Sequence, residues 1–465
     1  MRTLLINAPI IRDKSHYIDD DNYFPQGLLY LATNLKKNNL DVDIWDANNF
    51  YENNLRTLDS DEICENIEIN LNTRLDKFKP DLVGIGCMFS GAFQGLKMIA
   101  KQIKQKNPKI PVIVGGIPPT IFPREILRKY NEIDYVVVGE GENTLVDLIK
   151  EIENGSLTPK SLDGIAFRDN EEIKLNPKTK FIENLDELPF PDYNLLDIED
   201  YIIDTSHWHN PKNIKVGQPF PIISSRSCPN QCTFCSMWHV HGKKIRFRSP
   251  ENVLNQMEEL YYKKGVNYFQ FQDDNLTWDK KRIIEICDGI KERKMDIQFG
   301  TPNGVAINKL DKEIIDSMVD AGLVRISLAV ESGSDFIRNK VMKKHLKTEK
   351  IYEVVEECAK HKNLFINSFF VAGMPQETHE TLEETYQMIK NLPLNKFAIF
   401  FATPYPGTEL FNYCVEKSLL PNQVEDYMEM GNLQQKSTEP HFKPHTLTKE
   451  DLINYYEKIS DTILP

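Results

Sequence analysis

Long apolar runs are missing from this 465-residue sequence, and cysteine is scarce. No window approaches the roughly 18 uninterrupted apolar residues of a membrane-spanning helix, so we expect no transmembrane segment. The N-terminal residues MRTLLINAP run directly into a strand-like pattern and lack the apolar core of a signal peptide. Eight cysteines are also too few for a disulfide-stabilised scaffold.

Basic residues are outnumbered, which argues against a nucleic-acid partner. The chain has 56 Lys and Arg against 69 Asp and Glu, a net charge of −13, whereas nucleic-acid binding needs a basic stripe. Charged residues make up 27% and the hydrophobic set 40%, which is typical of a soluble globular protein. At roughly 150 residues per domain, the length predicts about three units.

The first part of the chain alternates short apolar runs with helical patterns, which predicts a doubly wound α/β domain over residues 1–150. The expected strands are Leu4–Ala8, Val42–Trp45, Leu82–Cys87, Val112–Val114 and Tyr135–Val138. Sheets of this kind bind ligands beyond the carboxyl ends of their strands. Small and polar residues stand at three of these ends, in Cys87–Gly91, Gly115–Thr120 and Gly139–Glu142.

Three further regions follow. Residues 151–216 are expected to form a linker with a hairpin and a proline-rich loop. Residues 217–410 again alternate strands and helices, and six such repeats predict a partial (β/α)6 barrel. The expected barrel strands are Ile222–Ser225, Tyr268–Phe271, Ile297–Phe299, Val324–Val330, Phe365–Val371 and Phe397–Ala402. Residues 411–465 are expected to form a small, mostly helical region that helps to shape a substrate pocket.

Three cysteines are crowded into one segment, Cys228-Pro-Asn-Gln-Cys232-Thr-Phe-Cys235, directly after the first expected barrel strand. The active sites of such barrels lie at this end of the strands. Three thiolates at this spacing suit one face of an iron–sulfur cubane and leave its fourth iron without a protein ligand. Zinc is the alternative, but structural zinc needs four ligands and no second cysteine pair exists. The nearest additional candidates are the pairs His207/His209 and His239/His241.

The cysteine spacing, with the aromatic Phe234 before the third cysteine, resembles the radical S-adenosylmethionine superfamily. The resemblance implies that the three cysteines bind a [4Fe-4S] cluster and that S-adenosylmethionine binds its open iron. It also implies cofactor contacts at Phe234 and at the ends of later strands. These are Gln272, Asp273 and Asp274 after the second strand, Ser327, Glu331 and Ser332 on and after the fourth, and Gly373 and Glu377 after the fifth.

The acidic residues in this set have an electrostatic rationale, because the ammonium and sulfonium groups of S-adenosylmethionine are cationic. Simpler interpretations stay open for two of them. Asp274 is also suited to cap the next helix, and Glu377 to lie in the first turn of one.

The N-terminal motifs resemble the cobalamin-binding domain of one branch of this superfamily. The residues implied to contact cobalamin are Ser90, Gly115, Gly116, Thr120, Gly139, Glu140 and Gly141. The chain departs from many such domains, because none of its ten histidines lies in an Asp-x-His-x-x-Gly motif. No cobalt ligand can therefore be named. A domain that has lost its cofactor is the alternative.

The resemblance implies a methyltransferase that acts on an unactivated carbon, or on phosphorus, of a small molecule or lipid. Cleavage of S-adenosylmethionine at the cluster yields a 5′-deoxyadenosyl radical, and a methyl group then passes from cobalamin to the substrate radical. No side chain is assigned a catalytic role. The alternative is a cobalamin-associated enzyme that rearranges, cyclises or dehydrogenates its substrate without methyl transfer. An oxygen-sensitive cluster predicts a cytoplasmic protein and an electron donor such as flavodoxin or ferredoxin.

Overall fold

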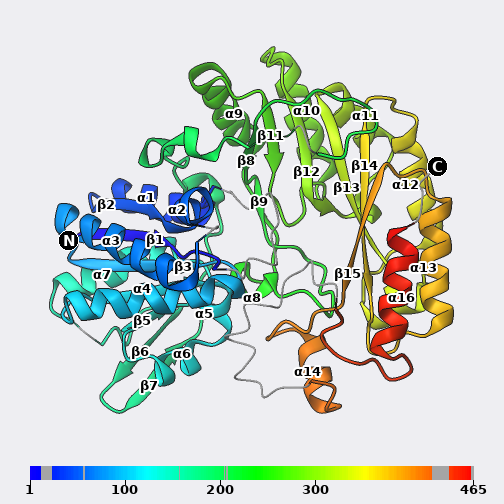
Figure 1. The fold of residues 1–465 in the computed structure, drawn as a ribbon. Helices are drawn as coiled ribbons and strands as arrows, with labels where there is room; N and C mark the ends of the chain where they lie inside the picture. The colour runs from blue at the N-terminus through cyan, green and yellow to red at the C-terminus, as the bar shows by residue number, and fades with distance from the viewer. Residues whose placement is uncertain are drawn as a thin grey trace.

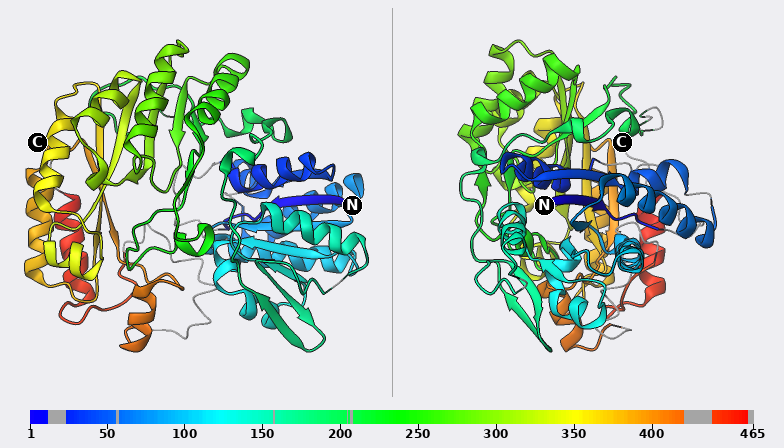
Figure 2. Two further views of the ribbon diagram at one scale, coloured as in Figure 1. Left: turned by 180° about the vertical axis from the view of Figure 1, so that it is seen from behind. Right: turned by 90° about the vertical axis from the view of Figure 1, so that its left-hand side faces the viewer.

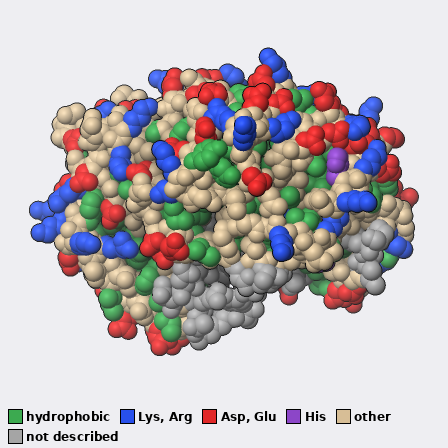
Figure 3. Space-filling model, turned by 90° about the horizontal axis from the view of Figure 1, so that it is seen from above, with side chains coloured by type: hydrophobic (Ala, Val, Ile, Leu, Met, Phe, Trp, Pro, Cys, Tyr) green, Lys and Arg blue, Asp and Glu red, His purple; other side chains and the backbone are tan. Residues whose placement is uncertain are grey.

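The described residues form two large sheets that lie beside one another, each covered by helices, and a third sheet of two short strands (Figures 1 and 2). The computed structural model describes residues 1–11, 24–55, 58–156, 158–203, 205, 208–420 and 439–461. None of the helices in these ranges combines the length and the apolar character needed to cross a membrane. On the face that Figure 3 shows, acidic and basic side chains are interspersed rather than gathered by sign.

The first sheet confirms the expected doubly wound fold. Its parallel strands lie in the order β2-β1-β3-β4-β5, so the topology switches sides between β1 and β3. They are β1 (Arg2–Asn7), β2 (Asp41–Asp46), β3 (Leu82–Cys87), β4 (Val112–Gly116) and β5 (Tyr135–Val137). One face is covered by α1 (Gln26–Lys37) and α7 (Glu142–Glu153). The other is covered by α2 (Ala47–Asn54), α3 (Ser60–Phe78), α4 (Phe93–Lys106) and α6 (Pro123–Lys129), and the short α5 (Ile117–Ile121) follows β4.

The hairpin that the sequence places in a linker belongs to this sheet. Its strands β6 (Ile165–Asp169) and β7 (Glu172–Asn176) add to β5 in antiparallel fashion. Ile165, Ala166 and Phe167 are at most 1% exposed, so β6 covers an edge that β5 would otherwise leave open. Local alternation predicts a hairpin but carries no information about which sheet the hairpin joins.

The second sheet confirms a partial barrel. Six parallel strands lie in the order β8-β11-β12-β13-β14-β15, with β8 and β15 at the two edges. They are β8 (Pro219–Ile222), β11 (Tyr268–Phe271), β12 (Gln298–Val305), β13 (Leu323–Glu331), β14 (Phe365–Ala372) and β15 (Lys396–Phe401). Their helices are α9 (Pro250–Lys264), α10 (Lys280–Glu292), α11 (Lys312–Asp320), α12 (Thr348–Ala359), α13 (His379–Asn391), α14 (Glu409–Glu416) and α16 (Lys449–Ser460).

The first barrel strand lies earlier than expected. Instead of Ile222–Ser225, β8 covers Pro219–Ile222, and a separate short pair, β9 (Ser225–Arg226) and β10 (Arg246–Phe247), follows it. Proline lacks an N–H and is tolerated on an edge strand, which is the place that β8 occupies. Beyond β9 the chain enters the cysteine loop and then the short helix α8 (Met237–His241).

Aromatic side chains join the two sheets. Phe24, which precedes α1, stacks on Tyr201 with ring centroids 4.2 Å apart and lies 5.0 Å from Phe220 of β8. Tyr193 packs against the same Phe220 at 4.8 Å. The connection between the sheets therefore contributes rings to a shared apolar contact.

Gly116 at the end of β4 gives a test of the first sheet. Its φ is +116°, and a Cβ there would lie 2.0 Å from the carbonyl oxygen of Cys87 in β3. We expect Gly116→Ala to lower the thermal unfolding midpoint far more than Gly155→Ala. Gly155 also has a positive φ (+81°), but no atom of the described residues lies within 4 Å of its Cβ position, so only strain of roughly 1–2 kcal/mol applies. Equal shifts in circular dichroism melts would contradict this assignment.

Candidate active site

The three clustered cysteines lie in the loop between β9 and α8. The N–H of Cys235 donates to the carbonyl of Cys232 at 3.1 Å, which folds the end of the loop into a tight turn. Asn275, just beyond β11, donates from Nδ2 toward the Sγ of Cys228 at 3.6 Å. The loop therefore meets the carboxyl end of the second sheet.

Residues inside the loop anchor it to the rest of the barrel. The N–H of Thr233 donates to the carbonyl of Met342 at 3.1 Å, and its carbonyl accepts from the N–H of Leu410 at 2.8 Å. Phe234 packs on a small apolar cluster that includes Met342 and Met374. Phe234 therefore holds the loop against this apolar cluster. This structural role is compatible with a cofactor contact.

The spacing of the thiols favours a cubane over zinc. Tetrahedral zinc with a Zn–S distance of about 2.3 Å places its sulfur ligands roughly 3.8 Å apart. Among the described residues, only Asp316, Glu357 and His361 bring three possible ligand atoms within 4.8 Å of one another, so the three thiols are spaced more widely. A cubane holds each cysteine on a different iron and suits such spacing.

Two of the histidines considered as zinc ligands contact backbone carbonyl groups. Nε2 of His239 is 2.6 Å from the carbonyl oxygen of Gly407. Nε2 of His209 is 3.1 Å from the carbonyl oxygen of Asn395, which precedes β15 and so lies at the opposite end of the barrel. His207 lies outside the described residues. Neither His209 nor His239 is therefore needed to explain the three thiols.

A buried ion pair stands beside the thiols. Burial raises the pKa of the Cys232 thiol to about 12 and that of Cys235 to about 11, while the charge of Lys344 lowers both. Burial alone would lower the pKa of Lys344, but Glu331 at 2.7 Å and the neighbouring Cys232 raise it above its ordinary value. Lys344 thus stays cationic beside thiols that would carry negative charge once deprotonated.

Two aspartates expected to contact S-adenosylmethionine position the strand that leads into the cysteine loop. Asp273 is buried and accepts hydrogen bonds from the N–H and hydroxyl of Ser224 and from the hydroxyl of Ser225. Asp274 accepts from the N–H of Ser227 at 2.8 Å. Asp279, rather than Asp274, caps α10.

The residues on β13 divide between the barrel interior and its carboxyl end. Ser327 faces the interior, where Nδ2 of Asn367 donates to its hydroxyl oxygen at 3.3 Å. Glu331 ends the strand with a φ of +70°, a conformation that is costly for a residue with a side chain. The Ser332 hydroxyl lies 3.2 Å from that of Thr385 and shapes the following turn. Of the three, Glu331 is the residue placed beside the thiols, through its ion pair with Lys344.

Glu377 is fully buried in the turn after β14. Its Oε2 accepts from the N–H groups of Gly373 and Met374, whereas its Oε1 has no hydrogen-bond partner among the described residues. Burial raises the pKa of Glu377 to about 7, although the two backbone hydrogen bonds lower it. The helix α13 begins at His379 with Thr378 as its cap, so Glu377 precedes the helix rather than lying in its first turn. Gln272, the remaining residue of the expected set, is half-buried at the end of β11.

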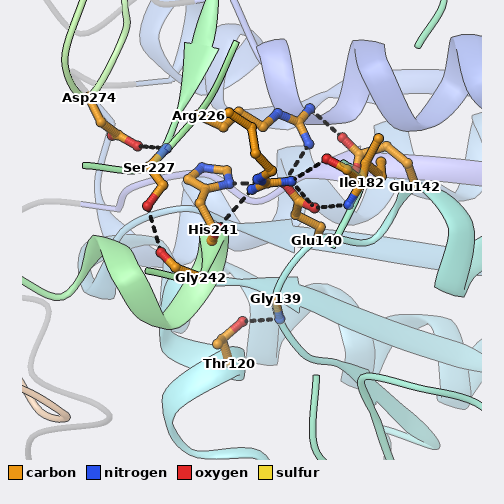
Figure 4. A network of polar contacts seen from close by, with 11 residues as sticks. Thr120, Gly139, Glu140, Glu142, Ile182, Arg226, Ser227, His241, Gly242 and Asp274 are labelled. Carbon is orange, nitrogen blue, oxygen red and sulfur yellow. Dashed lines mark hydrogen bonds and ion pairs between the residues drawn. The ribbon is translucent and has the colours of Figure 1, made fainter. Parts of the chain in front are cut away.

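The carboxyl edge of the first sheet carries the residues expected to contact cobalamin, Ser90, Gly115, Gly116, Thr120, Gly139, Glu140 and Gly141. The Thr120 hydroxyl accepts from the N–H of Gly139 at 3.0 Å and links two of these loops (Figure 4). Met88 and Phe89, which follow β3 at this edge, are 48% and 57% exposed. An edge rich in glycine beside two exposed apolar side chains suits a large, flat ligand such as a corrin ring.

Glu140 itself is engaged by arginines of the short strands β9 and β10 (Figure 4). Its carboxylate lies 3.1 Å from Arg226 and 2.7 Å from Arg246, and it accepts from the N–H of Ile182 at 3.0 Å. Glu142 pairs with a second nitrogen of Arg226 at 2.5 Å. The four charged side chains are at most 8% exposed, so this ion network, made of Glu140, Glu142, Arg226 and Arg246, is a buried one.

The ion network links the two candidate cofactor sites. Burial would raise the pKa of Glu140, but hydrogen bonds from His241 and Arg246 and the charge of Arg226 hold it well below its ordinary value. Arg226 stands two residues before Cys228, and Glu140 lies between two glycines of the first sheet's edge. The sequence motifs do not predict that Arg226, Arg246 and Lys344 belong to the site. The cations of Arg246-Phe247-Arg248 in an acidic chain are the one local signal that points to the network.

Removal of one charge tests the ion network. We expect Glu140→Gln to destabilise the protein by on the order of 3–5 kcal/mol, because it leaves buried guanidinium charge uncompensated. Glu259→Gln is the control, because Glu259 forms an exposed pair with Lys263 that contributes about 0.5 kcal/mol or less. Thermal melts of both variants check this, and an effect of Glu140→Gln no larger than that of the control contradicts it.

The buried Glu377 predicts a pH dependence. A carboxyl group whose pKa is raised in the folded state contributes stability at low pH, and this is lost as the pH rises from about 4.5 through about 7. We expect the wild type to lose on the order of 3 kcal/mol across this window relative to Glu377→Gln, which cannot titrate. Glu383→Gln is the control, because a hydrogen bond from Lys458 lowers the pKa of Glu383. Parallel pH curves for wild type and Glu377→Gln would overturn the interpretation.

Two protein families match the chain. The radical SAM superfamily matches residues 222–389, and the B12 binding domain matches residues 20–149. An uncharacterised methyltransferase of Pyrococcus horikoshii is 32% identical over 398 residues, which cover 85% of this chain and 79% of that protein. A cytidylyl-2-hydroxyethylphosphonate methyltransferase of Streptomyces wedmorensis is 28% identical over 438 residues, which cover 87% and 80%.

A solved structure shares the whole arrangement. The radical S-adenosylmethionine methyltransferase TsrM of Kitasatospora setae, with cobalamin and a [4Fe-4S] cluster bound, is similar with a TM-score of 0.67. The match covers 90% of this chain and 75% of that one at 17% identity, so it shows the fold. The cofactors expected from the sequence, a [4Fe-4S] cluster, S-adenosylmethionine and cobalamin, are those of the two matched families. The chain therefore belongs to the cobalamin-binding radical S-adenosylmethionine enzymes.

Proposed function

We propose that this enzyme methylates an unactivated carbon, or phosphorus, of a small molecule or lipid in the cytoplasm, with a flavodoxin or ferredoxin as electron donor. When bound, the cofactors supply a carbon-centred radical and a methyl group. The methyltransferases among the relatives support this proposal. The chain's own residues hold the cofactors in place and exclude water from them.

The observation that carries the proposal is the position of the ion network. Glu140 stands in the glycine-rich edge proposed for cobalamin, and its partner Arg226 leads directly into Cys228. Methyl transfer between two cofactors needs their reacting faces close together and fixed. A buried network between the two edges supports such an arrangement.

The thiols and the charged residues beside them are proposed to bind different cofactors. Cys228, Cys232 and Cys235 would hold three irons of the cluster. Glu331 and Lys344, a buried pair of opposite charges beside them, are suited to the ammonium and carboxylate of the methionine moiety. Charged partners aligned in this way favour one orientation of the sulfonium.

Anaerobic reconstitution tests both cofactors. We expect wild-type protein to hold about four irons and equivalent sulfide per chain, together with the visible spectrum of bound cobalamin. The triple variant Cys228→Ala/Cys232→Ala/Cys235→Ala should lose the iron and keep the cobalamin, because the corrin would bind to the first sheet. Cys287→Ala, a buried cysteine in α10, is the matched control and should keep both.

Product mass then separates methyl transfer from the alternative chemistry. A methyltransferase yields a product one methyl group heavier than its substrate, together with 5′-deoxyadenosine and S-adenosylhomocysteine. A product formed by rearrangement, cyclisation or dehydrogenation gains no methyl group. Protein that binds no cluster would refute the proposal, and a cluster without cobalamin would refute its methyl-transfer step.

A further inference from the structure

A polar cavity lies inside the barrel at the end opposite the cysteine loop. Its volume is about 90 Å³, well above the roughly 10–15 Å³ that a single water needs. Residues mostly from the first halves of β11 to β15 line it, and its polar lining comes from Tyr268, Thr301, Arg325, Ser327, Asn367 and Lys396. A cavity with this lining is suited to a hydrated or polar ligand rather than to an apolar one.

Arg325 is the dominant charge in the cavity. Its guanidinium carbon lies 4.1 Å from the ring centroid of Phe365 and 5.2 Å from that of Trp208. Contact with the faces of two rings leaves the N–H groups at the rim of the guanidinium plane available for hydrogen bonds. Burial lowers the pKa of Arg325, yet arginine remains cationic at neutral pH.

Within the part of the chain that the structure describes, this cation has no carboxylate partner. Among the described residues, no Asp or Glu lines the cavity or lies within ion-pair distance of Arg325. At the other end of the barrel, by contrast, Arg226 is paired with Glu140 and Glu142. Lys396 adds a second basic side chain to the same lining. Arg325 therefore gives the cavity a positive charge that no carboxylate of the described residues neutralises.

A second polar group in the cavity is unsatisfied. Nδ2 of Asn367 donates to the hydroxyl of Ser327, but its Oδ1 is buried without a hydrogen-bond partner among the described residues. A buried acceptor of this kind normally has a donor. A ligand that carries a hydroxyl or amide group near its anionic oxygen atoms would satisfy it.

We propose that this cavity binds the anionic end of the substrate, a carboxylate or a phosphate, with Arg325 as its bidentate partner. The inference rests on the proposed function and names the substrate class. Arg325 and Glu331 are six residues apart on β13, which corresponds to roughly 20 Å at about 3.3 Å per residue. A substrate anchored at Arg325 must therefore be elongated to bring its reacting atom to the cysteine end of the barrel.

Binding of inorganic phosphate and of acetate tests the site directly. Reconstituted holoenzyme is titrated with each anion at constant ionic strength, and the thermal unfolding midpoint is recorded for wild type, Arg325→Gln and Arg74→Gln. Arg74 is the matched control, because its guanidinium lies 5.6 Å from the ring centroid of Trp45, in the first sheet. We expect at least one anion to stabilise wild type and Arg74→Gln, and the effect to be lost in Arg325→Gln. Equal stabilisation of all three proteins, or of none, overturns the proposal.

Chemical modification tests the same site in the wild-type protein, so the result does not depend on whether Arg325→Gln folds. Phenylglyoxal modifies accessible arginines, and peptide mass mapping reports the extent at Arg325 and at Arg74. We expect the effective anion to reduce modification of Arg325 at least five-fold and to leave Arg74 unchanged. Protection by phosphate alone assigns a phosphorylated substrate, protection by acetate alone assigns a carboxylate, and no protection by either overturns the proposal. Formation of 5′-deoxyadenosine by the same wild-type preparation reports separately on the proposed function.

Discussion

The buried carboxylate of Glu140 is the interaction on which the arrangement of the two sheets depends. An ionised carboxylate in the interior is strongly unfavourable unless cations and hydrogen-bond donors surround it. Both of its cations, Arg226 and Arg246, come from short strands that follow the first barrel strand, whereas Glu140 belongs to the first sheet. A displacement that moved the arginines away while the site stayed closed to water would leave buried charge without a partner. The network therefore favours a single relative position of the two sheets.

That single position has a chemical consequence at Ser227, the residue between the network and the first cysteine. Ser227 has a φ of +73°, donates its N–H to Asp274 and donates its hydroxyl to the carbonyl of Gly242 at 2.6 Å (Figure 4). A left-handed residue other than glycine persists only where its surroundings determine it. The ion pair of Arg226 and the two hydrogen bonds of Ser227 therefore fix the direction in which the chain enters the cysteine loop. Chemistry that exchanges groups between two cofactors requires this kind of preorganisation, since small displacements of reacting atoms reduce rates steeply.

Local patterns account for much of the fold and only part of the site. The apolar runs predict β3 and β11 residue for residue, and the cysteine spacing predicts the metal-binding loop, because both signals are contained in a few consecutive residues. The partnership of Glu140 with Arg226 spans 86 residues, and no periodicity encodes it. For the same reason the sequence does not predict the hydrogen bonds that Asp273 accepts from Ser224 and Ser225. A carboxylate at a strand end signals polarity, whereas its partner is decided by tertiary structure.

The charged residues at the two ends of the barrel differ in whether the protein itself supplies a partner of opposite charge. At the cysteine end, Lys344 has Glu331 as a carboxylate partner 2.7 Å away, so the pair is nearly neutral before any cofactor binds. At the other end, the rings of Trp208 and Phe365 lie against the faces of the Arg325 guanidinium. Ring contacts stabilise a cation without using its N–H donors, which keep their preference for oxygen. A protein of net charge −13 had many carboxylates available for Arg325, and the described part of the chain places none there. A carboxylate or phosphate of a substrate that enters the barrel is the partner that we propose for Arg325.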